Sequence, residues 1–219
     1  MPQNLSLEQS MIYGTAGYTA AWSIYKLLQN GLTPQQGKVL VTGATGGVGS
    51  IAVSILAKLG YDVTAMTGKI DKVDFLTQLG ANKVVGRDIL QTSQKPLLKP
   101  QWAAVVDTVG GESLNSVLKS VQYAGSVTTC GTVSGTHLET QVFPFILRGI
   151  NLLGIASAES GRDIRLQLWD LLANDWKINQ WDNLVTHCDL KQLNAIYIDK
   201  ILRGELYGRT VIDINLSIA

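Results

Sequence analysis

The sequence predicts an α/β protein built on a doubly wound, six-stranded parallel sheet. Short apolar runs read as buried strands, segments with helical periodicity separate them, and a cluster of glycines joins the first clear strand to the next helix. The chain has 219 residues, of which 46% are apolar and 16% are charged, so it can bury a sizeable core. In such a sheet the crossovers are right-handed and ligands bind beyond the carboxyl ends of the strands.

The predicted elements alternate along the first 173 residues. A helix is expected over 15–28, because apolar residues recur there at helical spacing before Asn30 and Gly31 end it. The apolar run Val39, Leu40, Val41 then predicts a buried strand. Further strands are expected at 62–66, 83–85, 103–106, 126–130 and 151–155, with helices at 50–59, 72–79, 113–121 and 162–173.

The pattern changes after Trp176. A polar stretch is followed by a strand-like segment at 184–186, a helix over about 190–202 and a last strand at 210–214. We therefore expect this end of the chain to lie outside the six-stranded sheet.

The composition of the chain argues against nucleic acid, membranes and metal ions as partners. The net charge is +1 and the lysines and arginines are scattered, so no basic surface for nucleic acid or an anionic membrane is expected. Neither a signal sequence nor a run of about 18 apolar residues is found, and the two cysteines, Cys130 and Cys188, are too few for a disulfide scaffold or a structural zinc site. We expect a cytoplasmic protein without a metal.

The strongest local signal is the stretch VTGATGGVGS at 41–50. Its glycines allow a tight turn, close approach of the backbone to a ligand, and close packing of helix on strand. Free amides and the positive end of the helix dipole would then face a pyrophosphate, although a tight connection without a ligand would use the same glycines. The residues expected at the pyrophosphate are Thr45, Gly46, Gly47 and Val48.

Two other phosphate-binding classes are excluded. A P-loop needs Gly-Lys-Ser/Thr, but Gly49 is followed directly by Ser50. The short-chain dehydrogenases need a tyrosine with a lysine four residues later, and none of the seven tyrosines has one; Tyr197 has Lys200 three residues on. Nucleotide hydrolysis and short-chain dehydrogenase chemistry are therefore not expected.

Six motifs occur in order across nearly the whole chain: GTAGYTA at 14–20, VTGATGGVGS at 41–50, LGA at 79–81, VDTVGG at 106–111, PFILRG at 144–149 and GRTV at 208–211. With them the chain resembles the medium-chain dehydrogenase/reductase superfamily, in particular the zinc-free quinone oxidoreductase branch and its acryloyl-CoA reductase group. The resemblance implies a Rossmann fold that binds a nicotinamide dinucleotide.

The end of the second predicted strand indicates which nicotinamide. An NAD site places a carboxylate there to bind the ribose, whereas this chain has Thr67, Gly68 and Lys69. Lys69 with the Thr67 hydroxyl can bind a 2′-phosphate, and the family pattern places Arg87 at a second phosphate contact. NADP is therefore the expected cofactor, unless Lys69 is only a solvated lysine and Arg87 only pairs with Asp88.

The resemblance also places residues at the ends of the later strands along the path from adenosine to nicotinamide. These are Asp107 and Thr108 after the fourth strand, Gly131 and Thr132 after the fifth, and Ile155 to Ser157 after the sixth, each of which could instead be a plain loop residue. His137 and His187 read as structural, since neither lies in a cluster of carboxylates or cysteines. No catalytic residue is assigned in this chain.

In the family that the chain resembles, a β-rich, GroES-like catalytic domain precedes the nucleotide-binding domain. We expect residues 1–178 to form the NADP-binding Rossmann domain with an N-terminal linker helix, and 179–219 to be a segment of that catalytic domain, which is otherwise missing. The exposed face left behind, including Tyr13, Tyr18 and the segment after Trp176, should then be apolar or poorly ordered.

The expected function is that of the NADPH-binding part of an oxidoreductase that transfers hydride to an activated double bond of the acryloyl-CoA, enone or quinone type. This chain alone should bind cofactor yet turn over little substrate, because it lacks the groups that hold the acceptor carbon. The alternatives are a non-catalytic NADP-binding sensor or assembly module, and a structural remnant with no ligand. By resemblance, a homodimer is expected through the sheet edge at 151–155.

Overall fold

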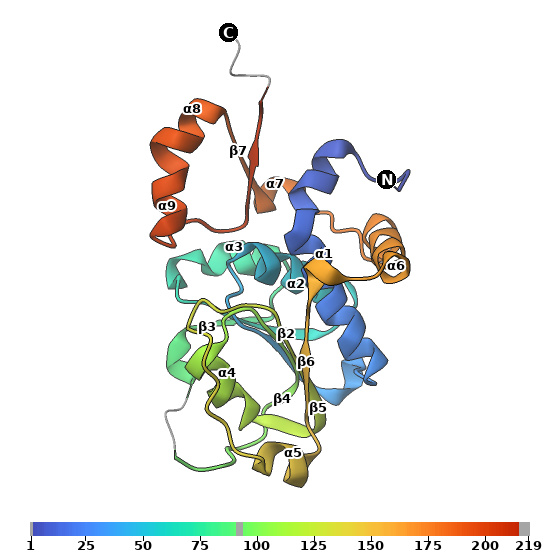
Figure 1. Cartoon of the computed structure of the whole chain (residues 1–219), viewed down its shortest axis with the longest axis vertical. Coiled ribbons are helices and arrows are strands. Elements are labelled where there is room, and N and C mark those ends of the chain that lie inside the picture. Colours follow the sequence, from blue (N-terminus) through green and yellow to red (C-terminus); the bar gives the residue numbers. More distant parts are fainter. Residues whose placement is uncertain (1, 91–93, 215–219) are drawn as a thin grey trace.

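The computed structural model describes residues 2–90 and 94–214. It confirms the predicted class: six parallel strands form one sheet in the order β3-β2-β1-β4-β5-β6, with helices on both faces (Figure 1). Strands β1 to β3 are added toward one edge of the sheet and β4 to β6 toward the other, so the strand order reverses between β1 and β4. Open sheets bind ligands at such a switch point. The strands are β1 (Lys38–Val41), β2 (Asp62–Met66), β3 (Lys83–Val85), β4 (Trp102–Asp107), β5 (Val121–Thr129) and β6 (Asn151–Gly154).

Strand residues alternate between two apolar layers. Val39 and Val41 pack into the layer with α1, α2, α3 and α6, whereas Leu40 packs into the layer with α4 and α5. The chain therefore buries both faces of its sheet. The helices are α1 (Leu7–Gln29), α2 (Gly47–Lys58), α3 (Val73–Gln78), α4 (Gly111–Leu118), α5 (Phe143–Arg148) and α6 (Arg162–Ala173).

The first helix is eight residues longer at its start than the sequence predicts. Ser6 caps it, accepting a hydrogen bond from the Gln9 amide (3.0 Å) in a reciprocal capping box. Gly14 breaks the helix with φ +49° and ψ −151°, so α1 is kinked there. Helix α1 packs on α2 through Ala16, since a Cβ on Gly47 would lie 3.4 Å from the Ala16 Cβ.

The expectation that Tyr13 and Tyr18 are exposed is wrong. Tyr13 is fully buried, and its phenol oxygen accepts a hydrogen bond from the backbone amide of Ile178 (3.0 Å). Its ring also packs edge to face against Trp181, with centroids 4.9 Å apart. Tyr18 is buried too and donates to the Ser160 hydroxyl (2.7 Å). Ile178 and Trp181, which follow Trp176, therefore cover Tyr13, whereas Ser160 and Arg165 contact Tyr18.

The C-terminal segment forms a second, smaller unit above the carboxyl ends of the main sheet (Figure 1). Its two strands pair in parallel as a separate sheet. Three of the polar contacts that join it to the rest are these: the Gly208 amide donates to the Thr45 carbonyl (2.8 Å), Arg209 Nε donates to the Ile12 carbonyl (2.7 Å), and His187 Nε2 lies 3.3 Å from Glu8 Oε1. Its elements are α7 (Trp181–Leu184), β7 (Val185–Cys188), α8 (Leu190–Gln192), a π-helical turn (Leu193–Tyr197), α9 (Ile198–Leu202) and β8 (Arg209–Ile212).

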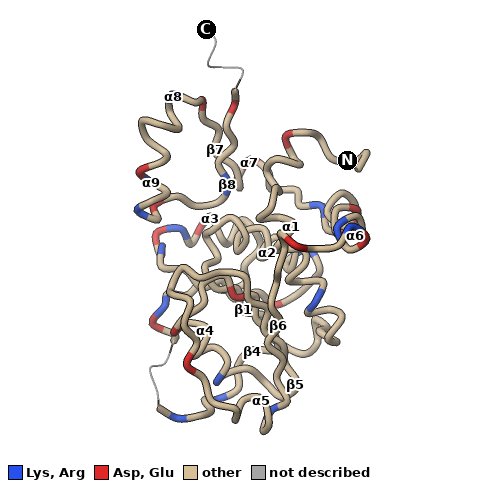
Figure 2. Tube along the Cα trace, in the orientation of Figure 1, with Lys and Arg blue, Asp and Glu red and all other residues tan. Residues whose placement is uncertain are grey.

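Charged residues are dispersed over the molecule. Figure 2 shows Lys and Arg spread along the tube with Asp and Glu among them. Within the described ranges, no helix combines the length and the apolar character needed to cross a membrane.

The buried Tyr13 phenol predicts that stability falls between about pH 10 and pH 12. Burial raises the pKa of Tyr13 to about 12, and the hydrogen bond from Ile178 lowers it by less. Because the folded-state pKa is the higher one, the contribution of this phenol is complete below about pH 10 and is lost as the pH rises toward 12. In urea unfolding at stepped pH, the free energy of unfolding should fall by about 2–3 kcal/mol more than it does for Tyr13→Phe; parallel curves for the two proteins would contradict this.

Candidate cofactor site

The glycine turn is held by a backbone contact that tolerates no side chain. A Cβ atom on Gly49 would overlap the carbonyl oxygen of Gly43 and lie 2.8 Å from Ala44 Cα. Gly43 itself has φ +59°, a conformation that favours glycine. Helix α2 therefore begins directly after β1, and its cap, Gly46, supplies no side-chain hydrogen bond. The amides of its first turn stay available for a ligand.

A cavity of about 850 Å³ lies over this turn, between the carboxyl ends of the sheet and the C-terminal segment. The C-terminal segment contributes an apolar wall that includes Leu193, Ile198 and Ile201. Nine of the residues that the sequence assigns to the cofactor line the cavity: Thr45, Gly46, Gly47, Val48, Thr67, Gly68, Lys69, Arg87 and Thr108.

The polar part of the wall is cationic. Lys69, Arg87, Arg203 and Arg209 line the cavity, and no carboxylate, histidine or cysteine belongs to its wall as far as the described chain shows. Arg203 is partly neutralised, because its Nε lies 2.9 Å from a Glu205 carboxylate oxygen. The wall suits an anionic ligand with more than one charged group.

Lys69 and Arg87 come together at the ends of β2 and β3. Gly68 lies under the Arg87 guanidinium, since a Cβ there would be 2.8 Å from Arg87 Cζ. The pKa of Lys69 is lowered, first by burial and then by the positive charge of Arg87, while Asp71 raises it in part. Among the described residues, neither cation has a carboxylate within 4 Å, and the ion pair between Arg87 and Asp88 that the sequence left open is not formed.

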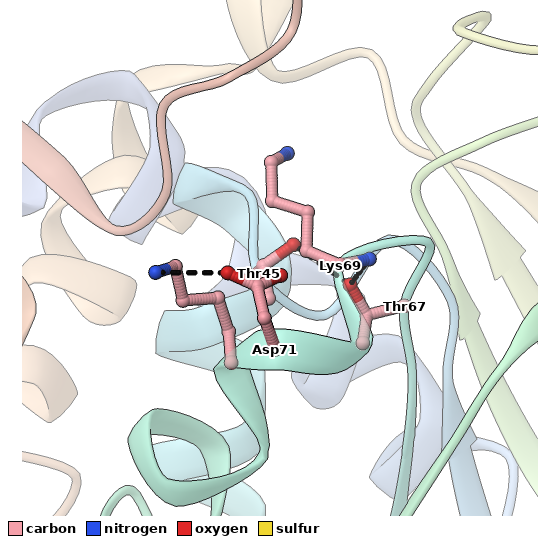
Figure 3. A network of polar contacts seen from close by, with 5 residues as sticks. Thr45, Thr67, Lys69 and Asp71 are labelled. Atoms are coloured by element: carbon pink, nitrogen blue, oxygen red, sulfur yellow. Dashed lines mark hydrogen bonds and ion pairs between the residues drawn. The ribbon is translucent and has the colours of Figure 1, made fainter.

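Two threonine hydroxyls fix the backbone beneath this cationic pair. The Thr45 and Thr67 hydroxyl oxygens lie 3.0 Å apart within hydrogen-bond distance, and the Lys69 amide donates to the Thr67 hydroxyl (2.9 Å). Figure 3 shows the Lys69 side chain extending away from these contacts. The glycine turn and the end of β2 are thereby locked to each other, which sets the distance between the pyrophosphate region and the cationic pair.

Arg209 is a site residue that the sequence reasoning missed. A Cβ on Gly47 would lie 2.8 Å from Arg209 Nη1, so the guanidinium reaches the start of α2. Its Nε donates to the Ile12 carbonyl, which lies beside the kink at Gly14. Burial lowers the pKa of Arg209 from its very high ordinary value, but a guanidinium stays charged. The only signal for it was its place in the closing GRTV motif.

Asp107 does not line the cavity. Its carboxylate is fully buried and accepts hydrogen bonds from the hydroxyls of Thr42 (2.7 Å) and Thr129 (2.9 Å) and from the Gly110 amide (3.0 Å). It therefore ties together the carboxyl ends of β1, β4 and β5. Its neighbour Thr108 lines the cavity in its place, donating to the Thr42 carbonyl (2.8 Å).

Gly131, Thr132 and residues 155–157 also lie outside the cavity wall. Thr132 is exposed on the loop after β5. Ser157 begins a short 3-10 turn after β6, and its carbonyl accepts hydrogen bonds from Arg165 (3.2 Å) and from Ser160 (3.1 Å). The structure thus brings together the turn and the ends of β2 and β3, but not these two loops.

The described residues offer no metal centre. No group of three or more His, Cys, Asp and Glu side chains is arranged to hold an ion in the described part of the chain. Cys130 is a poor ligand and a poor nucleophile, because burial, and then Asp107, raise the pKa of its thiol to about 12.

The chain is similar to known dehydrogenases and reductases. A family model described as zinc-binding dehydrogenase matches residues 47–174. The acrylyl-CoA reductase AcuI of Ruegeria pomeroyi is 44% identical over 98% of this chain and 65% of its own length. The chain spans 64–66% of the length of three such relatives. The described donor set does not fit the zinc that the family description names, and we derive no step through that metal.

Two solved structures match almost the whole chain. Protein yhfP of Bacillus subtilis with NAD bound has a TM-score of 0.93 and 46% identity, and the match covers 97% of this chain and 65% of that one. The yhdH oxidoreductase of Salmonella enterica in complex with NADP has the same TM-score and coverage at 40% identity. These relatives therefore hold two different nicotinamide dinucleotides.

The close contact at Gly49 predicts the effect of a single methyl group. Gly49→Ala should lower the Tm by about 5 °C and weaken dinucleotide binding at least about tenfold, because backbone atoms on both sides must move. Gly154→Ala is the matched control, since nothing lies within 4 Å of a Cβ there. Differential scanning calorimetry and titration of the dinucleotide measure both effects; equal behaviour of the two variants would refute the account of the turn.

Proposed function

The chain belongs to the zinc-binding dehydrogenase family of the medium-chain dehydrogenase/reductase superfamily, and on that premise we propose that its cavity binds NADP(H) for the reduction of an activated double bond. The single observation that supports this most strongly is the pair Lys69 and Arg87, which has no carboxylate partner among the described residues. Lys69 follows the end of β2, where an NAD site would place a carboxylate for the ribose, and Arg87 follows β3 beside it.

The preference for NADP rests on residues of this chain. One solved relative holds NAD and another holds NADP, so similarity alone does not choose between them. Lys69 and Arg87 are two cations that a 2′-phosphate of nearly two negative charges would neutralise. A ribose hydroxyl, which is neutral, would leave both cations without a counter-charge, although only Lys69 is partly buried and Arg87 is exposed.

The pyrophosphate would lie over the glycine turn. The free amides at the start of α2 and the positive end of its dipole offer hydrogen bonds to one side of it. Arg209, whose guanidinium reaches Gly47, supplies a charge from the C-terminal segment. We therefore propose that the described residues of 1–178 form the cofactor-binding domain and that residues of 193–212 form the second wall of the cavity.

The chemistry would come from the cofactor. A bound reduced nicotinamide would supply a hydride to an electron-poor carbon, and the names of two relatives suggest an acryloyl thioester or a quinone as acceptor. An enone has the same kind of activated double bond. The part of the chain described here contributes binding and orientation, since its cavity wall holds no carboxylate, histidine or cysteine to exchange a proton. We expect this chain alone to bind the cofactor and to turn over slowly.

Removing the Lys69 charge tests the coenzyme assignment. Lys69→Ala should raise the Kd of NADPH about tenfold or more, because a charge-assisted contact to the 2′-phosphate contributes about 1.5–3 kcal/mol. The Kd of NADH should change less than about twofold. Lys38→Ala, an exposed lysine at the start of β1, is the control for the same loss of charge. Calorimetric titrations that give the parent protein equal affinity for both coenzymes would contradict the proposal.

We also propose that the chain forms a homodimer through β6. Within residues 2–90 and 94–214, β6 pairs with β5 on one side and lies at the edge of the sheet on the other, where backbone groups are open to a second strand. Nearby, α5 exposes Ile146 and Leu147, which are 68% and 57% accessible. The two features make one apolar edge that a second copy of the chain could cover.

Light scattering at tens of micromolar should give a mass of twice 23.6 kDa. Leu153→Lys places a charge on the edge strand, where Leu153 is half-buried, and should shift the mass to that of a monomer. A monomeric mass for the parent protein at every concentration would overturn the dimer.

A further inference from the structure

We propose that three residues outside the phosphate-binding pair, Tyr207, Lys72 and Asp71, set the preference of the cavity for a 2′-phosphate. Tyr207 holds Lys72, and Lys72 holds the Asp71 carboxylate away from Lys69. The inference rests on the proposed function, since it concerns how the same cavity separates NADPH from NADH. The three are positioning residues: they act through Lys69.

Tyr207 is anchored on helix α3. Its ring meets that of Phe75 edge to face, with centroids 5.0 Å apart and an interplanar angle of 72°. Phe75 is itself buried in the core, so the partner is fixed. The Lys72 ammonium lies 4.8 Å from the centroid of the Tyr207 ring, within cation–π range. The tyrosine thus fixes where the lysine head group stands.

Lys72 in turn fixes Asp71. Its Nζ lies 3.0 Å from Asp71 Oδ2, and this ion pair lowers the pKa of the carboxyl and raises the pKa of the ammonium. Figure 3 shows the Asp71 carboxylate engaged by this contact while the Lys69 side chain extends away from it. Asp71 nevertheless lies within electrostatic reach of Lys69, because it raises the pKa of that lysine.

The position of the Asp71 carboxylate affects which coenzyme the cavity prefers. A carboxylate at the end of the second strand is what an NAD site uses, and it repels a 2′-phosphate. Asp71 lies two residues after Lys69 and is largely exposed, so little besides Lys72 restrains it. Released from Lys72, it could pair with Lys69, cancel that charge and place a negative charge beside the phosphate.

The arrangement also ties coenzyme preference to docking of the C-terminal segment. Tyr207 directly precedes Gly208, whose amide donates to the Thr45 carbonyl of the glycine turn (2.8 Å). A Cβ on Gly208 would overlap the Leu184 carbonyl oxygen, so the backbone of this loop packs closely against the end of α7. When this loop is docked on the glycine turn, the Tyr207 ring lies beside the Lys72 ammonium.

Binding of NADPH and NADH to a set of variants of the full chain tests the proposal. Lys72→Gln should raise the Kd of NADPH about three- to fivefold and leave the Kd of NADH within about twofold, the size expected for exposed charges. Tyr207→Leu keeps an apolar contact with Phe75 and changes no charge, so a twofold to threefold loss of NADPH preference would come from the lost hold on Lys72.

Two further variants make the test decisive. The double variant Asp71→Asn/Lys72→Gln should return the ratio of the two Kd values to within about twofold of the parent, because no carboxylate is left to release. Lys83→Gln removes an exposed lysine at the far end of β3 and should leave the ratio unchanged. The Kd of NADH serves as the check on folding, since both coenzymes use the rest of the site.

The outcomes separate this inference from the proposed function. If the parent protein prefers NADPH but Lys72→Gln and Tyr207→Leu keep its ratio, or if the double variant is not rescued, the positioning role is overturned. If the parent binds neither coenzyme, the proposed function itself fails. Intrinsic tryptophan quenching and calorimetry both report these constants without any turnover.

Discussion

The close approach of Gly49 to the Gly43 carbonyl is the contact on which the rest of the site depends. It lets helix α2 begin directly at the end of β1, so that the unpaired amides of the first turn stand at the switch point of the sheet. The buried Asp107 carboxylate then holds β1, β4 and β5 in register at the same edge. Together they make a rigid floor on which a ligand can be bound through backbone groups.

Charge is distributed unevenly around that floor. The wall of the cavity brings together four cations, one after β2, one after β3 and two from the C-terminal segment. Carboxylates such as Asp71 and Glu205 form ion pairs with partners of their own. Gathering like charges costs free energy in the empty protein, and an anion that neutralises them recovers it. Burial lowers the pKa of Lys69, and the positive charge of Arg87 lowers it further; this second effect reflects the repulsion between the two cations.

Sequence reasoning succeeded where the signal is local. Strand runs, the glycine turn and the residues at the end of β2 are short patterns whose chemistry is contained in a few neighbours, and nine of the expected site residues line the cavity. It failed where distant segments meet. Arg209 lies near the end of the sequence, yet its guanidinium reaches Gly47. Tyr13, which was expected to be exposed, is covered by Ile178 and Trp181. Asp107 was placed at the right strand end, but only the structure shows that its carboxylate accepts hydrogen bonds from four internal donors.

The central claim is that Lys69 and Arg87 hold a 2′-phosphate, and phosphorus-31 NMR of bound NADP tests it directly. The resonance of the 2′-phosphate reports its own protonation, which occurs near pH 6 in an ordinary phosphomonoester. Two adjoining cations favour the dianion, so the account predicts that this pKa falls by about one unit or more on binding, and that it returns toward its free value in Lys69→Ala. A 2′-phosphate that titrates at the same pH bound and free would show that it stands in solvent, and would contradict the account.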